Sequence, residues 1–139
     1  MADEPVRKPS PQWLEGDDRR AKVKRAKDNE HRIAGAFGGK RLPRSGGRRW
    51  AGSSDTTTDQ GDIISPHYLI EHKHTIKDSI SLKKEWLRIV ADGARRQAKT
   101  SALVVTFETA NKKDRDDYVV VPLEEFLRLM RLAGLDSPL

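Results

Sequence analysis

Residues 61–75, GDIISPHYLIEHKHT, contain two apolar runs with a turn sequence between them. The first run, 62–64, is short. The second, 68–75, changes between apolar and polar side chains as a half-buried β-strand does. Ser65-Pro66-His67 separates the two runs, and a proline at this point favours a turn. We therefore expect a β-hairpin over residues 62–75.

Strand alternation divides the side chains of residues 68–75 between two faces of the sheet. One face is expected to carry Leu69, Glu71, Lys73 and Thr75, and the other Tyr68, Ile70, His72 and His74. A tight return would bring Asp62 next to Glu71, and two such carboxylates can share a hard divalent ion such as Mg²⁺. Lys73, on the same face as Glu71, could activate a water molecule or stabilise charge that develops on a phosphate.

Periodic apolar spacing predicts the other elements. We expect helices from about Asp17 to Phe37, from Ser79 or Ser81 to about Gly93, and from Leu123 to Gly134, with strands at 102–107 and 118–121 and a short one near 41–44. The predicted buried helix positions are Val23, Ala26, Ile33, Ala34, Phe37, Leu82, Trp86, Ile89, Val90, Gly93, Leu123, Phe126, Leu127 and Met130. The order helix, hairpin, helix, strand, strand, helix predicts an α/β fold with a mixed central β-sheet flanked by helices.

The charge of the chain is distributed unevenly. Residues 1–50 carry 14 basic and 7 acidic side chains, whereas residues 51–139 carry 13 basic and 14 acidic ones. An excess of positive charge in the first third favours a polyanion as partner. Residues 1–16 contain three prolines and no apolar periodicity, which predicts a flexible arm before a domain at 17–135 and a tail at 136–139.

Composition excludes several classes of function. The chain has no cysteine, so disulfides, thiolate zinc sites and cysteine nucleophiles are excluded. No apolar run approaches the roughly 20 residues that a membrane-spanning helix needs, and the first residues lack the apolar core of a signal peptide. We expect a soluble, cytoplasmic protein. The glycine pairs fit neither a Walker loop nor G-x-G-x-x-G, so no nucleotide cofactor is expected.

Glu30 lies on the apolar stripe of the first predicted helix, four residues after Ala26 and three before Ile33. A carboxylate on a buried face is unfavourable unless it is paired or binds a cation. Two interpretations remain open. Glu30 is either a helix-edge residue that reaches solvent or pairs with a nearby arginine, or a member of a site with Asp62 and Glu71.

Basic residues gather in the glycine-rich stretch 38–61. Phosphate contacts from such a loop would give salt-sensitive binding without sequence readout; the alternative is a basic loop with no fixed partner. The predicted DNA-binding residues here are Lys40, Arg41, Arg44, Arg48 and Arg49, and Lys83 extends the patch. His72 and His74 share a strand face, but zinc requires three or four ligands, so we expect structural or surface roles for both.

Together these residues resemble the PD-(D/E)xK nuclease superfamily, and within it the archaeal-type Holliday-junction resolvases and their phage-encoded relatives. The resemblance extends from about Asn29 to Phe126. It rests on Glu30, on Gly61-Asp62-Ile63, on the strand 69–75, LIEHKHT, and on Arg44-Ser45-Gly46, which adds Ser45 to the predicted DNA-binding residues. Gly61 stands where the superfamily has its proline, and the segment between Ser45 and Asp62 is longer than in the archaeal enzymes.

The resemblance implies a Mg²⁺-dependent endonuclease, with Mn²⁺ able to substitute, that cuts DNA in four-way junctions as a homodimer. In this reading Glu30, Asp62, Glu71 and the backbone carbonyl of His72 bind the metal, and Lys73 serves the attacking water. It also implies a restriction-endonuclease-like fold, and a phage-encoded enzyme would act in the host cytoplasm. The alternatives are a nicking or general structure-specific endonuclease, and a basic nucleic-acid-binding protein without catalysis.

Overall fold

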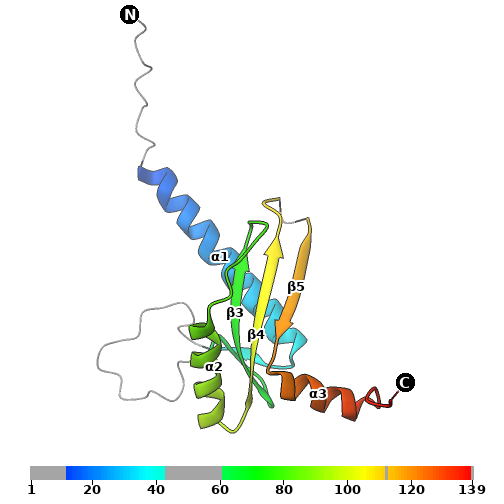
Figure 1. Ribbon diagram of the computed structural model, residues 1–139. Helices are drawn as coiled ribbons and strands as arrows, with labels where there is room; N and C mark the ends of the chain where they lie inside the picture. Colours follow the sequence, from blue (N-terminus) through cyan, green and yellow to red (C-terminus); the bar gives the residue numbers. More distant parts are fainter. Residues whose placement is uncertain (1–11, 43–60, 112, 139) are drawn as a thin grey trace, which may run out of the picture.

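The computed structural model describes residues 12–42, 61–111 and 113–138, and it has an α/β fold (Figure 1). The elements in chain order are α1 (Gln12–Ala36), β1 (Lys40–Arg41), β2 (Ile63–Ile64), β3 (Tyr68–Thr75), α2 (Lys84–Arg96), β4 (Thr100–Glu108), β5 (Arg115–Val120) and α3 (Leu123–Leu132). The five strands form one sheet in the order β1-β2-β3-β4-β5. Only β3 and β4 are parallel, so the sheet is mixed, as the sequence predicts.

The predicted hairpin over residues 62–75 is confirmed. β2 and β3 pair antiparallel, with Ile63 opposite Ile70 and Ile64 opposite Leu69. Ser65 closes the turn, because its backbone N–H donates to the Tyr68 carbonyl at 2.9 Å and its hydroxyl accepts from the Tyr68 N–H at 3.0 Å. This short connection fixes which residue of β3 faces each residue of β2.

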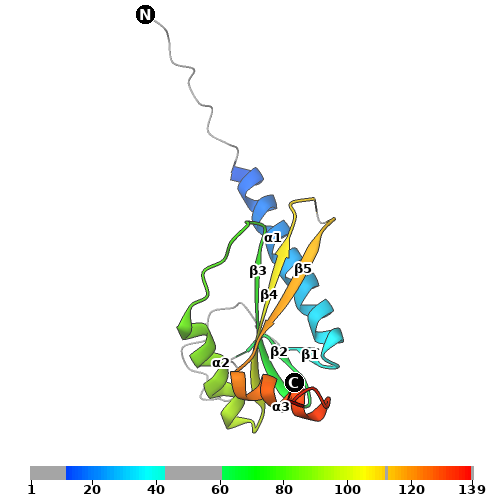
Figure 2. The same cartoon turned by 45° about the vertical axis from the view of Figure 1, so that its right-hand side comes forward.

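Helices α1 and α2 cover opposite faces of the sheet (Figure 2). Ile33 and Ala34 of α1 pack with Ile70 of β3 in one apolar cluster, while Val90 and Ala94 of α2 pack with Leu69 in another. Neighbouring residues of β3 therefore point to different helices, and the predicted alternation along this strand is confirmed. The odd-numbered positions 69, 71 and 73 face α2.

Two helix starts differ from the prediction. α1 begins at Gln12, so residues 12–16 are helical rather than part of an arm, and Asp17 and Asp18 lie inside the helix instead of capping it. α2 begins at Lys84, with Lys83 at the cap position and no capping side chain, so neither Ser79 nor Ser81 caps it. The end of α1 is as predicted: Gly38 has a φ of 65°, a left-handed conformation that glycine adopts without strain.

Several side chains predicted to be buried are exposed. Val23 of α1 is 56% exposed and Leu82, before α2, is 51% exposed. In α3, the predicted core residues Leu123, Phe126 and Leu127 are 71%, 55% and 44% exposed. α3 extends away from the sheet (Figure 1) and turns Glu125 toward the protein instead, where the carboxylate accepts a hydrogen bond from the Tyr68 hydroxyl. Its apolar stripe faces solvent.

Candidate active site

The hairpin brings Asp62 close to Glu71 and Lys73, whose charges both act on it. Asp62 directly precedes β2. Its backbone N–H donates to the Ile70 carbonyl at 2.8 Å, and its carboxylate accepts from the His72 N–H at 2.9 Å, so Asp62 contacts the residues on either side of Glu71. The tight return therefore brings the two carboxylates near each other, and their use as a shared metal site stays a prediction.

Asp62 is a buried carboxylate, with 8% of its surface exposed. Burial first, and then the nearby negative charge of Glu71, raises its pKa from 3.8 to about 7. The backbone N–H of His72 donates to Asp62 Oδ2 at 2.9 Å and opposes this shift without reversing it. Glu30 also raises the pKa of Asp62, so burial and two neighbouring carboxylates together disfavour the charge of Asp62.

Gly61 packs closely against β3. A Cβ atom at this position would lie 2.9 Å from the side chain of Leu69 and 3.2 Å from the Ile70 carbonyl oxygen. Both contacts are with the strand that carries Glu71. A small residue therefore allows the backbone before Asp62 to approach β3 closely.

Lys73 links Glu71 to the start of α2. Its Nζ lies 3.0 Å from Glu71 Oε1 and 4.5 Å from the centre of the Trp86 ring, a cation–π distance. The side chains of Lys73 and Glu71 are only 28% and 21% exposed. Trp86, predicted only as a core residue, thus holds the lysine at the site; its sequence signal, an aromatic on an apolar stripe, does not distinguish this role from packing.

Glu30 is buried, with 7% exposed, and its carboxylate forms an ion pair with the guanidinium of Arg41 in β1. One of the two open interpretations, pairing with a nearby arginine, is thus realised. Its charge still contributes to the raised pKa of Asp62. Glu30 therefore belongs to the electrostatic environment of the site, and its ionic partner is a residue that the sequence assigned to DNA binding.

The donor groups here suit a hard divalent cation, because all are oxygen atoms of carboxylates or backbone. Within the described residues, no three His, Asp or Glu side chains lie close enough to form a metal-binding group as they stand. The backbone N–H of His72 donates to Asp62, and because the N–H and C=O of a strand residue point to the same side, the His72 carbonyl also points toward the side of β3 on which Asp62 lies. Its role as a metal ligand stays a prediction. The residues therefore suit a divalent cation by their chemistry, because a bound cation would offset the negative charge of the carboxylates.

The predicted DNA-binding residues are only partly described. Lys40 in β1 is exposed, Arg41 pairs with Glu30, and Lys83 lies beside Trp86, with its Nζ 5.5 Å from the ring centre. Arg44, Ser45, Arg48 and Arg49 lie outside the described residues. Lys40 and Arg41 form β1, which follows α1 after a short turn and pairs antiparallel with β2. The next residue, Leu42, donates its backbone N–H to the Asp62 carbonyl at 2.8 Å, so this strand runs toward Asp62.

A polar network lies behind the site, on the α1 side of the sheet, and the sequence did not predict it. His72 Nε2 lies 2.8 Å from the Thr106 hydroxyl, which donates to Asp117 at 2.6 Å; Asp117 in turn pairs with Arg32 of α1. His74 Nε2 lies 2.9 Å from Glu108. Burial lowers the pKa of His72 to about 4, so its ring is neutral, as a structural role requires.

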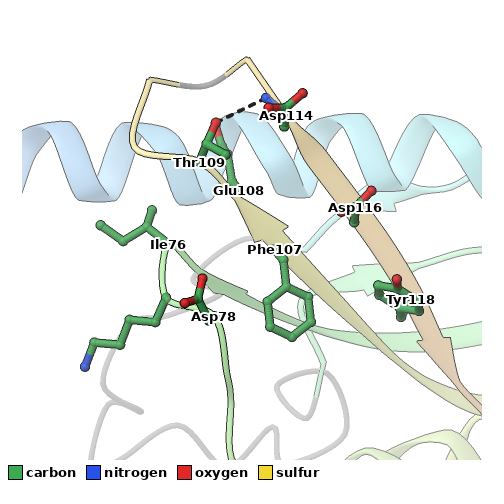
Figure 3. A pocket seen from close by; sticks show the side chains of 9 residues that line it. Ile76, Asp78, Phe107, Glu108, Thr109, Asp114, Asp116 and Tyr118 are labelled. Carbon is green, nitrogen blue, oxygen red and sulfur yellow. Dashed lines mark hydrogen bonds between the residues drawn. The ribbon is translucent and has the colours of Figure 1, made fainter.

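The hollow in Figure 3 lies elsewhere and contains none of the predicted site residues. It has a volume of about 450 Å³ and is formed by the end of β4, the start of β5 and the residues after β3. Asp78, Asp114 and Asp116 make it acidic, and the rings of Phe107 and Tyr118 meet edge to face, with their centroids 6.1 Å apart. Its negative charge would repel the phosphate backbone of a nucleic acid.

Comparison with known proteins gives no assignment: no family model, curated protein or solved structure matches the chain. Within the described residues, no helix is both long and apolar enough to cross a membrane.

Proposed function

We propose that the protein is a metal-dependent endonuclease that hydrolyses the DNA backbone, of the PD-(D/E)xK type, and that its substrates are four-way junctions. The observation that carries the proposal is the hairpin that holds Asp62 within electrostatic range of Glu71, with Lys73 paired to Glu71 along β3. Two carboxylates of this kind can hold a divalent ion for metal-assisted phosphodiester hydrolysis, and the lysine can stabilise charge that develops on the phosphate.

Each residue has a distinct role in the proposal. Asp62, Glu71 and the His72 carbonyl hold Mg²⁺, or Mn²⁺ in its place, and Glu30 completes the negative environment. The ion supplies Lewis-acid stabilisation of the phosphate charge. Lys73, held between Glu71 and Trp86, orients the attacking water or stabilises the charge that develops on phosphorus. Lys40 and Lys83 contact the DNA backbone.

The proposal is tested by cleavage of a mobile four-way junction in Mg²⁺, beside linear, flapped and single-stranded DNA of the same sequences. We expect Mg²⁺-dependent cuts placed symmetrically about the branch point and little cutting of linear duplex. Equal cutting of flaps and junctions would favour a general structure-specific or nicking endonuclease. Absence of any cleavage in Mg²⁺ and Mn²⁺ would overturn the catalytic proposal.

The second candidate function is nucleic-acid binding without catalysis. It is favoured by the ion pairs themselves, because Glu30 is matched by Arg41 and Glu71 by Lys73. Carboxylates with such partners can be purely structural. The raised pKa of Asp62 argues against this candidate, since a buried carboxylate whose charge is disfavoured lowers stability and is typical of functional sites.

The proposal includes a homodimer, because symmetric cleavage of a junction requires two active sites. The exposed apolar side chains of α3 are a surface that a second copy would cover, in particular Leu123, Phe126 and Leu127, which lie within about 100° of one another around the helix. β5 is also an edge strand, free to extend the sheet.

Replacing Leu123→Glu and Phe126→Glu together is expected to convert a dimer into a monomer. Two buried like charges in a symmetric interface repel each other and lose apolar contact. Sedimentation velocity at 5–100 µM measures the change as a halved mass, with circular dichroism to verify folding. Glu124→Gln, on the charged side of the same helix, is the control and should leave the mass unchanged. A wild-type protein that is monomeric at 100 µM would contradict this interface.

A further inference from the structure

The middle of α1 contains a strongly basic segment, which follows the acidic residues Glu15, Asp17 and Asp18. Residues 19–27, RRAKVKRAK, contain six cations and no acidic side chain. These cations are Arg19, Arg20, Lys22, Lys24, Arg25 and Lys27, and all are exposed except Arg25, which is half-buried. None belongs to the predicted DNA-binding residues, which begin at Lys40. This segment, defined as the basic turns of α1, is therefore a charged surface to which no role has been given.

The basic turns have no apolar face to hold them against the protein. Successive residues of an α-helix are 100° apart, so the six cations surround the axis, and Val23 between them is 56% exposed. Both views show this end of α1 extending beyond the ends of the strands (Figures 1 and 2). Like charges three or four residues apart, such as Arg20 and Lys24, repel each other. A polyanion would relieve that repulsion.

The chemistry of the segment favours a nucleic-acid backbone over a lipid surface. A helix that lies on a membrane needs an apolar face to insert, and the basic turns present none. A hollow of about 630 Å³ runs beside them, lined by Lys22, Arg25, His74 and Lys77 among others. Arg25 fixes one end of this hollow by donating to the Ala110 carbonyl at 3.2 Å. Its described lining contains no carboxylate, so it suits a chain of phosphates.

We infer that the basic turns of α1 are a second DNA-contacting surface, which binds the phosphate backbone of the duplex next to the site of cleavage. The inference rests on the proposed function. Lys27 precedes Glu30 by three residues, which is about 4.5 Å along the axis, and Arg19 lies a further ~12 Å away. Because one rigid helix carries both the basic turns and Glu30, DNA held by the basic turns has a fixed position relative to Glu30. The basic turns extend along about three to four base pairs of a duplex.

The test is the salt dependence of binding to a 30-base-pair duplex in EDTA, where no cleavage occurs. Lys22→Gln, Lys24→Gln and Lys27→Gln together keep helix propensity and remove three positive charges. The slope of log K against log salt is expected to decrease by about 2.7, since each phosphate contact contributes about 0.9. Arg95→Gln, Lys113→Gln and Arg131→Gln remove the same net charge elsewhere and should change the slope by less than about 1.

The outcomes separate this inference from the proposed function. An unchanged slope in the α1 variant, or an equal decrease in the control, overturns the inference whether or not the protein cuts DNA. A decrease of the expected size in a protein that cuts no DNA leaves the surface established and the nuclease proposal refuted. Wild-type binding to phosphatidylserine vesicles tighter than to duplex, and lost in the α1 variant, would identify a membrane surface as the partner and overturn the inference.

Discussion

Glu71→Gln is expected to reduce Mg²⁺-dependent cleavage of junction DNA by about 10²–10³-fold, the range typical of losing one charge-stabilising group. Glutamine keeps the size of the side chain and removes its negative charge, so the proposed metal ligand is lost. The ion pair with Lys73 is lost too, but both side chains are partly exposed, so its effect on stability is at most about 1 kcal/mol. Single-turnover cleavage at saturating DNA measures the effect.

DNA affinity in EDTA is expected to stay the same or to increase, because a carboxylate that repels phosphate has been removed. Glu85→Gln is the matched control: Glu85 is an exposed acidic residue in the first turn of α2 and carries no role in the proposal. It should cut at the wild-type rate. If Glu71→Gln retains more than a tenth of wild-type activity, the carboxylate is not a metal ligand and the non-catalytic candidate gains support.

The sequence predicts the hairpin well because its information is local. Alternation along 68–75 and a proline in the turn leave one register that buries Ile70 on one face and Leu69 on the other. The same hairpin brings Asp62 within electrostatic range of Glu71. This central part of the site could therefore be predicted from fifteen residues without knowledge of the rest of the chain.

The partners of these residues could not be predicted, because they come from distant segments. Thr106 meets His72 across 34 residues, through the parallel pairing of β3 with β4, and Arg41 reaches Glu30 only because β1 lies beside the end of α1. For α3 the helical spacing was predicted correctly, but its apolar face was expected to pack on the core and faces solvent instead. An amphipathic pattern shows that a helix has an apolar face, and it does not say whether the same chain or another one covers it.

The second large effect concerns Asp62. In EDTA, Asp62→Asn is expected to raise the free energy of unfolding above that of the wild type at pH 8 by as much as about 4 kcal/mol, while abolishing cleavage. Asparagine still offers an oxygen to the His72 N–H, so the backbone contact survives. The variant lacks the buried negative charge that Glu71 and Glu30 oppose.

The pH dependence follows from the direction of the shift. Folding raises the pKa of Asp62 from 3.8 to about 7, so the folded state binds its proton more tightly than the unfolded state does. The stability contributed by the protonated form is fully present below about pH 4 and is lost as the pH rises through 7. The difference between variant and wild type should therefore be small at pH 4 and largest above pH 7, as measured by urea unfolding.

Added Mg²⁺ distinguishes a metal ligand from a carboxylate that is merely buried. An ion that binds only the folded state stabilises it by about 2.7 kcal/mol at 100 times its dissociation constant. At pH 8, Mg²⁺ should stabilise the wild type and leave Asp62→Asn nearly unchanged, so the two unfolding curves approach each other. A difference that is constant from pH 4 to 8 would mean that folding does not disfavour the charge of Asp62. Equal stabilisation of both proteins by Mg²⁺ would mean that Asp62 does not bind the metal, and its buried charge would then have no catalytic explanation.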